Sequence, residues 1–319
     1  MAGWLLFGYQ PMGAKKTKIV FLSLILLVGL VWSAVRQLPD KRLHLVFCDV
    51  GQGDAILITH GSSQILIDGG PNNQVLNCLA NNMPFWDREI EMVVLTHPEK
   101  DHFGGLIDVI ERYDVKYFVV NSVVNDSAGF WEFREVVLAE EALIFSPQEG
   151  ERLKIGPLIF EVFWPEERLD DLLVWSHFAE ALRDKEKILG AASVAGNPNE
   201  TSIVLKLSFG NFDTLLTGDI GFISEKKLDL ADLGEIEVLK IGHHGSKYST
   251  SEEFLAQVKP ELAVISVGKN SFGHPTEEVL SKLTSLGIQY LRTDKQGEIE
   301  IVSDGKSWYN ERTKPVQTK

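Results

Sequence analysis

An apolar strand that ends in a cluster of histidines and carboxylates is the feature that most constrains how this chain folds. Residues 92–95 are apolar throughout, as in a strand buried on both faces, and residues 103–113 have helical spacing. Between them stand side chains of the types that bind zinc, manganese and iron: His97, Glu99, Asp101 and His102. Because a strand end is a rigid edge, the segment predicts a metal site. The alternative is a helix start with acidic capping residues and two incidental histidines.

Three further predicted strands end in residues of the same types. The residues that follow these strands are Asp219, His243, His244 and His274. Five of the eight histidines therefore come just after predicted strand ends. Most have Gly or Pro nearby, and these residues set loop conformation. This clustering predicts that the side chains meet at one edge of a sheet.

The body of the chain reads as short β-rich runs with helical stretches between them. The predicted strands cover residues 43–48, 55–59, 64–67, 92–95, 116–120, 158–163, 202–209, 212–216, 236–241, 262–267, 289–292 and 298–302. Many strands with interleaved helices indicate a sandwich of the α/β or α+β class rather than a helix bundle. Residues 165–198 stand apart as an inserted excursion, helix-like over residues 172–189.

The first 42 residues have a different composition from the rest. Residues 19–35 carry no charge, and at about 1.5 Å per residue they span about 26 Å, marginally enough for a membrane core. Lys15, Lys16 and Lys18 precede this run, which favours a cytoplasmic N-terminus and an exported body. A cleaved signal peptide and a buried helix are the alternatives. The predicted organisation is a basic segment over residues 1–18, a membrane anchor or signal segment over 19–35, a linker over 36–42, a folded domain over 43–303 and a tail over 304–319.

Charge and cysteine content narrow the function. Residues 1–42 contain six Lys or Arg and one Asp, so the other 25 basic and 44 acidic residues give the body a net charge of −19. A body this acidic does not bind nucleic acid through bulk charge, and a phosphodiester would need metal ions or a local basic groove. Cys48 and Cys78 form no CxxC pair, which argues against a cysteine zinc site. We interpret Cys48 as a small buried hydrophobic residue, because nothing in the sequence supports a disulfide.

The order of the motifs resembles that of metallo-β-lactamase-fold hydrolases. In this chain His-x-x-x-Asp-His at residues 97–102 is followed by Gly218-Asp219 and then by His274. Flanking segments narrow the resemblance to the C-terminal hydrolase domain of ComEC-type DNA-internalisation competence proteins. These segments are residues 47–55, 67–71, 96–105, 216–219, 243–246 and 273–275. The resemblance covers about residues 43–303, and the excursion at 165–198 is longer than the family leads us to expect.

The resemblance implies an α+β fold, the four-layer αβ/βα sandwich, with one or two divalent metal ions, zinc or manganese, at the sheet edge. The implied metal ligands are His97, Glu99, Asp101, His102, Asp219 and His274. Asp219 would bridge two ions, Asp68 would orient the ligand loop, and Asp54 is a further candidate for contact with the site. The catalytic candidates are Asp101, which would orient the attacking water, and His243 and His244. Either histidine would complete a metal position, donate a proton to the leaving group or only hydrogen-bond the loop.

Two positions depart from the fuller family pattern. Glu99 stands where many members have His, and residues 199–202 occupy the region where another His is expected. The ComEC-like branch often has a carboxylate at the first position and lacks the second His, so both departures fit the branch while weakening one metal position. Oxygen-rich ligation favours manganese, with zinc as the alternative. We interpret His44, His60 and His177, which lie outside the motifs, as ordinary surface or strand histidines.

The expected activity is metal-dependent hydrolysis of a phosphodiester, with DNA as the substrate in a competence or DNA-uptake context. This substrate rests on the resemblance, because the fold hosts many hydrolases. Lys247 and Lys269 are candidate phosphate contacts. One rival is a hydrolase of a small ester, lactone or cyclic nucleotide, and the other is a catalytically weak binding module in a DNA-uptake assembly. The hydrolase domain is expected outside the cytoplasm, anchored through residues 19–35 or secreted, with a separate membrane channel protein as a further candidate partner.

Overall fold

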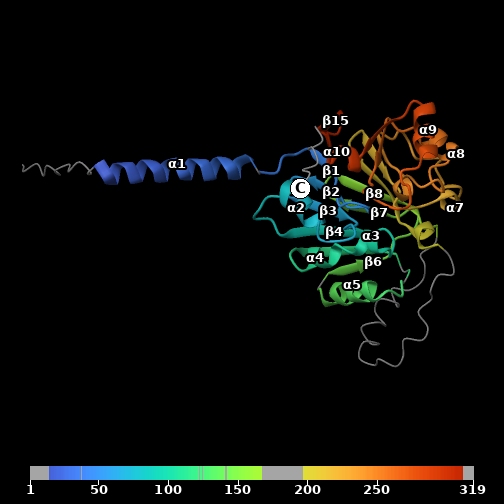
Figure 1. The fold of residues 1–319 in the computed structure, drawn as a ribbon, viewed down its shortest axis with the longest axis horizontal. Coiled ribbons are helices and arrows are strands. Elements are labelled where there is room, and N and C mark those ends of the chain that lie inside the picture. Colours follow the sequence, from blue (N-terminus) through green and yellow to red (C-terminus); the bar gives the residue numbers. More distant parts are fainter. Residues whose placement is uncertain are drawn as a thin grey trace, which may run out of the picture. The chain divides into compact units, whose positions relative to one another are not determined.

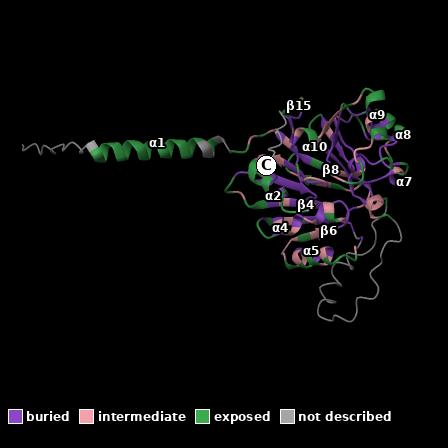
Figure 2. Ribbon diagram, in the orientation of Figure 1, coloured by how far each residue is buried: buried purple, intermediate pink, exposed green. Residues whose placement is uncertain are grey.

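The computed structural model describes residues 14–36, 38–121, 123, 125–140, 142–166 and 197–311, in two units, Met1–Pro39 and Asp40–Lys319. In the first unit the described residues form helix α1 (Ala14–Arg36), whose apolar side chains, such as Phe21 and Leu26, are exposed (Figure 2). Within the described residues, no helix has both the length and the hydropathy that crossing a membrane requires. The membrane anchor or signal segment expected over residues 19–35 stays a prediction.

The second unit is built on two mixed sheets (Figure 1). The first has the strand order β15-β14-β1-β2-β3-β4-β5-β6 and the second the order β13-β12-β11-β10-β9-β8-β7. The strands of the first sheet are β1 (Leu43–Phe47), β2 (Ile56–His60), β3 (Ser63–Ile67), β4 (Glu89–Leu95), β5 (Asp114–Val120), β6 (Leu143–Phe145), β14 (Ile299–Ser303) and β15 (Trp308–Glu311). Those of the second are β7 (Arg152–Ile155), β8 (Leu158–Trp164), β9 (Val204–Phe209), β10 (Phe212–Leu216), β11 (Val238–Lys240), β12 (Leu262–Ile265) and β13 (Gln289–Arg292).

Each sheet has a parallel half. Strands β3 to β6 pair in parallel in the first sheet, and strands β10 to β13 pair in parallel in the second. The remaining pairs, such as β1 with β2 and β9 with β10, are antiparallel. In parallel α/β sheets, functional sites form where the carboxyl ends of the strands meet at one edge. The predicted ligand residues follow strands of these parallel halves.

Helices cover the outer faces of both sheets. Helices α2 (Val75–Asn82), α3 (Lys100–Phe103), α4 (Leu106–Ile110) and α5 (Ala128–Ala139) share a buried apolar cluster with the first sheet. Helices α8 (Glu252–Val258) and α9 (Glu277–Ser285) share one with the second, and the short helices α7 (Phe222–Glu225) and α10 (Thr293–Gln296) lie in its connections (Figure 1). A third cluster lies between the sheets.

Three apolar interiors between four layers define the αβ/βα sandwich. Neighbouring residues on a strand point to opposite faces, so one strand serves two interiors. On β1, Leu45 packs between the sheets while Val46 packs under the helices. On β10, Leu216 packs between the sheets and Leu215 under the outer helices. This double burial explains why most side chains along these strands are apolar, and it confirms the predicted four-layer architecture.

The structure has a strand at every place where the sequence predicts one, but the segments around them differ. The helix predicted over residues 103–113 is shorter in the structure, because α4 covers only Leu106–Ile110, and α3 (Lys100–Phe103) precedes it with Gly104 and Gly105 between them. A Cβ at Gly105 would lie 2.2 Å from the carbonyl oxygen of Gly69, so glycine is needed at this position. Strand β15 pairs with β14 inside the segment predicted as a tail over residues 304–319. The helix predicted over residues 172–189 lies outside the described residues.

Cys48 and Cys78 form a disulfide that ties the segment after β1 to helix α2, with 5.7 Å between their Cα atoms. Both side chains are buried in the cluster under the helices. The interpretation of Cys48 as a small buried hydrophobic residue is therefore right about its surroundings and wrong about its bonding. A separation of 30 residues carries no signal of pairing in one sequence.

Candidate metal centre

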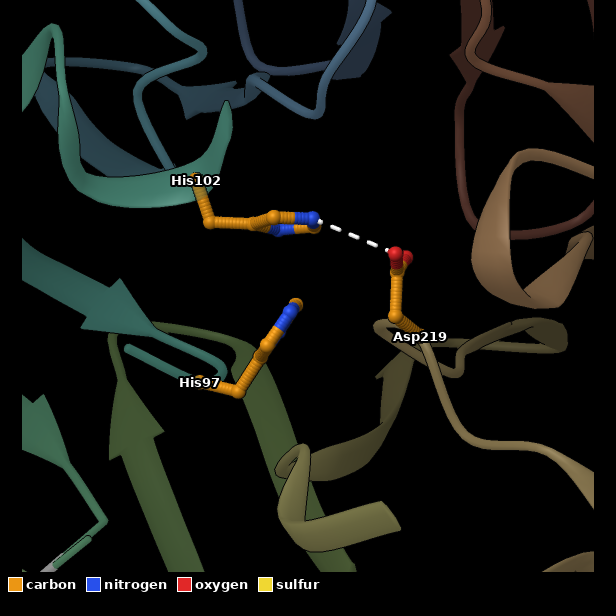
Figure 3. A group of neighbouring side chains, drawn as sticks. All are labelled: His97, His102 and Asp219. Atoms are coloured by element: carbon orange, nitrogen blue, oxygen red, sulfur yellow. Dashed lines mark ion pairs between the residues drawn. The ribbon is translucent and has the colours of Figure 1, made fainter. Parts of the chain in front are cut away.

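The two sheets bring their ligand-bearing strand ends to one place. Strand β4 of the first sheet ends just before His97, and strand β10 of the second ends just before Asp219. His102, on the short helix α3, faces Asp219 with 3.4 Å between Nε2 and Oδ2, as the dashed line in Figure 3 shows. His97, His102 and Asp219 are all buried, and each offers a ligand atom within 4.8 Å of the others. Residues 122 positions apart in the sequence thus form one cluster.

The cluster extends into neighbouring groups of the same kind. One offers ligand atoms from Asp101, His102 and His244, and another from Asp54, Asp219 and His244, each set within 4.8 Å. His244 Nε2 lies 3.3 Å from Asp219 Oδ2 and 3.4 Å from Asp101 Oδ2. Asp219 therefore stands between a histidine pair on one side and His244 with Asp101 on the other. This arrangement places it where a carboxylate could contact two ions.

The hydrogen bonding of the histidine side chains indicates whether a cation fits among them. The Nε2 atoms of His97, His102 and His244 are buried, and none has a hydrogen-bond partner among the described residues. A buried polar atom without a hydrogen bond is costly, by about 1–3 kcal/mol, so such atoms call for an explanation. Imidazole nitrogens facing shared carboxylates are the donor set of zinc, manganese and iron sites. The residues present fit a divalent metal ion.

Electrostatics support the same conclusion. Burial, together with the neighbouring His102, lowers the pKa of His97 well below its usual value, so its ring is neutral, the form that binds metals. Burial alone would lower the pKa of His102, but Asp219 and Asp68 outweigh it and raise that pKa well above the usual value. Burial and the nearby His243 lower the pKa of His274 to about 4. A divalent cation would replace the proton that the carboxylates otherwise hold on His102.

Asp68 orients this cluster from behind. Its Oδ2 accepts a hydrogen bond from Nδ1 of His102 at 2.8 Å and from the Thr96 hydroxyl at 2.7 Å, and its Oδ1 accepts from the Thr96 amide at 2.8 Å. A proton held on Nδ1 leaves the Nε2 lone pair of His102 aimed at Asp219. Asp68 itself has φ of 58°, an uncommon conformation for a non-glycine residue. The carboxylate thus sets both the tautomer and the direction of the ring.

Replacing Asp68 with Asn is expected to weaken metal binding by about 10- to 100-fold. Asn has the same shape and tolerates positive φ. Its side chain has only one acceptor oxygen, so it cannot accept hydrogen bonds at the positions of both Oδ1 and Oδ2. Titration calorimetry with zinc and with manganese measures the change. Asp49→Asn is the matched control, because Asp49 is an exposed aspartate outside the cluster. An Asp68→Asn dissociation constant within about twofold of the wild-type value would contradict the orienting role.

A buried lysine lies beside the ligands. The Lys240 ammonium contacts Asp54, lies 3.2 Å from Asp219 Oδ1 and donates to the Gly218 carbonyl at 2.6 Å. Burial alone would lower the pKa of Lys240, but the two carboxylates outweigh it and raise that pKa above its usual value. Lys240 therefore stays charged and compensates two carboxylates whose side chains are almost fully buried. Asp54, predicted as a supporting residue, contacts this lysine, and its Oδ1 also lies 3.5 Å from His244 Nδ1.

His243 and His244 occupy a strained turn at the end of β11. Their φ angles are 47° and 53°, and non-glycine residues held in this region cluster at functional sites. His244 donates from Nδ1 to the carbonyl of Ser266 at 2.9 Å, which leaves Nε2 free to face Asp101 and Asp219. The described neighbour of the His243 ring is the Asn199 amide, 3.1 Å from Nε2. The two adjacent histidines thus have different surroundings.

The cluster opens into a pocket of about 670 Å³. The predicted site residues on its walls are Glu99, Asp101, Asp219, His243, His244 and His274. Glu99 and His274 belong to none of the close ligand groups, although a ring nitrogen of His274 is buried without a hydrogen bond in the described structure. His274 faces His243, with 5.5 Å between ring centroids. Of the predicted phosphate contacts, neither Lys247 nor Lys269 is among the lining residues.

Sequence reasoning missed three residues of the site. Lys240 lies within a predicted strand, where a charged side chain among apolar ones is a signal of a buried ion pair. Asn199 contacts His243, and it lies in the region that lacks the His expected from the family pattern. Phe272 lines the pocket beside His274, and a phenylalanine in a loop gives no warning of its position. His44 pairs with Asp40 and Glu300 outside the pocket.

The fold and the His/Asp cluster together define a class of protein. The sequence pattern of the "Metallo-beta-lactamase superfamily" matches residues 48–269, and the chain belongs to this family. Among solved structures, the metallo-beta-lactamase fold protein YhfI from Bacillus subtilis superposes with a TM-score of 0.51 at 10% identity, covering 84% of this chain and 100% of that chain. At this identity the likeness concerns the fold alone.

Within the family, this chain is related to competence proteins. It is 29% identical over 272 residues to "ComE operon protein 3" of Bacillus subtilis, covering 79% of this chain and 32% of that protein. It is 28% identical over 289 residues to "Competence protein ComA" of Neisseria gonorrhoeae, covering 88% of this chain and 35% of that protein. The chain thus spans about a third of the length of these relatives. The resemblance inferred from the motifs is confirmed.

Proposed function

We propose that this chain is a metal-dependent phosphodiesterase that cleaves DNA in a DNA-uptake context. The observation that carries the proposal is the buried cluster of Asp219 with His97 and His102, because the Nε2 atoms of both histidines lack a hydrogen bond in the described structure and converge beside an open pocket. The relationship to competence proteins supports DNA as the substrate. The acidic body supports a role for metal ions, since a phosphodiester would otherwise meet mostly negative charge.

The cluster assigns roles to individual residues. His97, His102 and Asp219 would hold one ion, and His244, Asp101 and Asp219 a second. A bound divalent ion supplies Lewis-acid chemistry and positive charge for the phosphoryl group. Manganese is favoured over zinc by the carboxylates, with Glu99 within reach of the same pocket. His274 remains a candidate ligand from the pocket wall.

The residues that face the pocket are the candidates for proton transfer and for orienting the attacking water. Because the Ser266 carbonyl accepts from Nδ1 of His244, the neutral ring presents the Nε2 lone pair and suits a ligand. His243 faces the same pocket without a carboxylate hydrogen bond of its own in the described structure, and it suits the donation of a proton to the leaving oxygen. Asp101, on the pocket wall, would orient the attacking water. In this assignment His244 is a metal ligand and His243 is the proton donor.

A cleavage assay tests the proposal. With manganese or zinc, the full chain is expected to cleave a DNA oligonucleotide, and a chelator or His97→Ala is expected to abolish cleavage. A lactone, an ester and a cyclic nucleotide serve as rival substrates. Cleavage that persists unchanged in His97→Ala would indicate a contaminating nuclease and would contradict the proposal. Faster turnover of a rival substrate than of DNA would replace it with the small-molecule hydrolase.

The disulfide supports a location for the domain. Disulfides persist in oxidising compartments and are rare in the cytoplasm, so the Cys48–Cys78 bond supports a domain that works outside it. To test this location, intact cells are quenched with acid, the protein is unfolded, and its cysteines are exposed to a thiol-specific alkylating reagent. Both cysteines are expected to be protected until a reductant is added. Immediate alkylation of both in freshly quenched and unfolded protein would contradict the proposed location.

A further inference from the structure

An exposed phenylalanine lies on the wall of the candidate metal pocket. Phe272 is 72% exposed although it is a large apolar side chain, and it belongs to the loop between β12 and α9. Its ring stacks on the ring of His274, with 5.7 Å between centroids and 29° between planes. The packing of the fold thus leaves most of this ring open to solvent. Its open surface is available to a ligand in the pocket.

The loop that carries Phe272 is tightly fixed. Asn270 Oδ1 accepts from the amides of Phe272 and His274, both at 3.0 Å, and its Nδ2 donates to the carbonyls of Gly268 and His274. Gly268 packs so closely that an added Cβ would lie 2.2 Å from the carbonyl carbon of Gly51. These contacts fix the backbone of the loop, and the Phe272 ring stacks on His274 beside the candidate ligand cluster. A side chain held in advance on a rigid support binds with a smaller loss of entropy.

The charged side chains on the pocket walls attract a phosphate only weakly without metal ions, so an apolar contact would add to substrate binding. The ionisable groups on its walls are three carboxylates (Glu99, Asp101 and Asp219), one lysine (Lys100) and three histidines (His243, His244 and His274). Without metal ions, the phosphates of a substrate gain little from this balance. A nucleobase, in contrast, can stack on an aromatic ring irrespective of its sequence. Stacking requires an unpaired base, because the faces of bases in a duplex are covered by their neighbours.

We propose that Phe272 is a stacking platform for an unpaired nucleobase beside the reacting phosphate, so that the substrate is single-stranded rather than duplex nucleic acid. The inference rests on the proposed function, which supplies the phosphodiester. Phe272 acts on the base and not on the reacting phosphate, so it determines the choice of substrate. Its loss weakens binding, whereas the chemical step depends on the cluster behind it.

Binding without cleavage is the main test. The full chain is titrated in EDTA with a single-stranded oligonucleotide of about 12 nucleotides that carries 2-aminopurine, whose fluorescence falls when the base stacks. Phe272→Leu keeps an apolar side chain without a π face, and Phe272→Trp keeps the π face. We expect about 5- to 100-fold weaker binding and no quenching for Phe272→Leu, with both recovered in Phe272→Trp. Phe85→Leu is the control, because Phe85 is similarly exposed outside the pocket.

A second oligonucleotide, abasic at the 2-aminopurine position, isolates the contact. If the ring and the base touch, removing both costs no more than removing either, so Phe272→Leu is expected to bind the abasic strand as the wild type does. Equal binding of the intact strand by wild type and Phe272→Leu would overturn the inference. So would tighter binding of duplex than of single strand, or no binding by the wild type.

The same variants separate this inference from the proposed function. In the manganese-dependent cleavage assay, Phe272→Leu is expected to raise KM while leaving kcat within about threefold of the wild type. If the wild type binds and quenches 2-aminopurine but cleaves no DNA, the proposed function fails and the stacking site stands. If it cleaves DNA and Phe272→Leu changes neither binding nor KM, the stacking site fails and the proposed function stands.

Discussion

Replacing Lys240 with Met is expected to lower the free energy of unfolding of the metal-free protein by about 3–5 kcal/mol. The Lys240 side chain is 1% exposed and pairs with Asp54 and Asp219, whose side chains are 1% and 3% exposed. Its loss removes the nearest positive charge of Asp54 and one of the positive charges beside Asp219. Urea denaturation in EDTA, followed by circular dichroism, measures the change. With manganese or zinc the deficit is expected to shrink, since a cation beside Asp219 restores positive charge.

Two further variants make this result specific. Lys295→Met removes a lysine whose side chain is 62% exposed, and it is expected to change stability by less than about 0.5 kcal/mol. Asp54→Asn added to Lys240→Met removes one of the orphaned charges, so the double variant is expected to be more stable than Lys240→Met alone. A loss below about 1 kcal/mol for Lys240→Met would contradict the proposed role of Lys240 as the internal counter-charge.

Replacing Asp219 with Asn is expected to lower kcat/KM for DNA cleavage by at least about 100-fold. Asp219 belongs to two of the close groups of candidate ligands, and the loss of several kcal/mol of charge stabilisation corresponds to two or more factors of ten. Asn keeps the shape of the side chain, so the fold is retained. Steady-state cleavage rates measured across a range of manganese concentrations give the effect.

The matched control is Asp232→Asn, which changes an exposed aspartate in the loop before β11. It is expected to leave kcat/KM unchanged within about twofold. Asp219→Asn should also need far more manganese to reach its own maximal rate, because a carboxylate that would bind the metal is lost. An Asp219→Asn enzyme with a wild-type rate and metal requirement would rule out a site centred on this residue.

The sequence predicts the two-sheet architecture well because burial on two faces leaves a plain signal. The last four residues of β4 and all of β12 are apolar, and polar side chains begin where these strands end. The prediction that the ligands meet at the edge of one sheet is wrong, because His97 and His102 follow β4 of the first sheet and Asp219 follows β10 of the second, so the packing of the two sheets brings them together. Edge strands such as β15 are mostly exposed, so their sequences lack the apolar run that marks a strand buried on two faces. For this reason the predicted tail over residues 304–319 begins before the last strand.

Contacts between loops could not be predicted from the sequence. The φ angles of His243 and His244 decide that one ring faces Asp219 and the other faces Asn199, and no spacing rule encodes them. Lys240 pairs with Asp54, which is 186 positions away in the sequence. The Cys48–Cys78 bond depends on where α2 packs, which the sequence pattern did not predict. In each case the three-dimensional path of a loop, rather than residue type, sets the partner.

The metal content of the purified full chain tests the central claim most directly. After incubation with zinc or manganese and removal of free metal by gel filtration, elemental analysis by mass spectrometry counts the ions bound per chain. We expect at least one divalent ion per wild-type chain and a near-zero count for Asp219→Asn, with Asp232→Asn matching the wild type. A near-zero count for the wild type with both metals would contradict the assignment of His97, His102 and Asp219 as a metal centre.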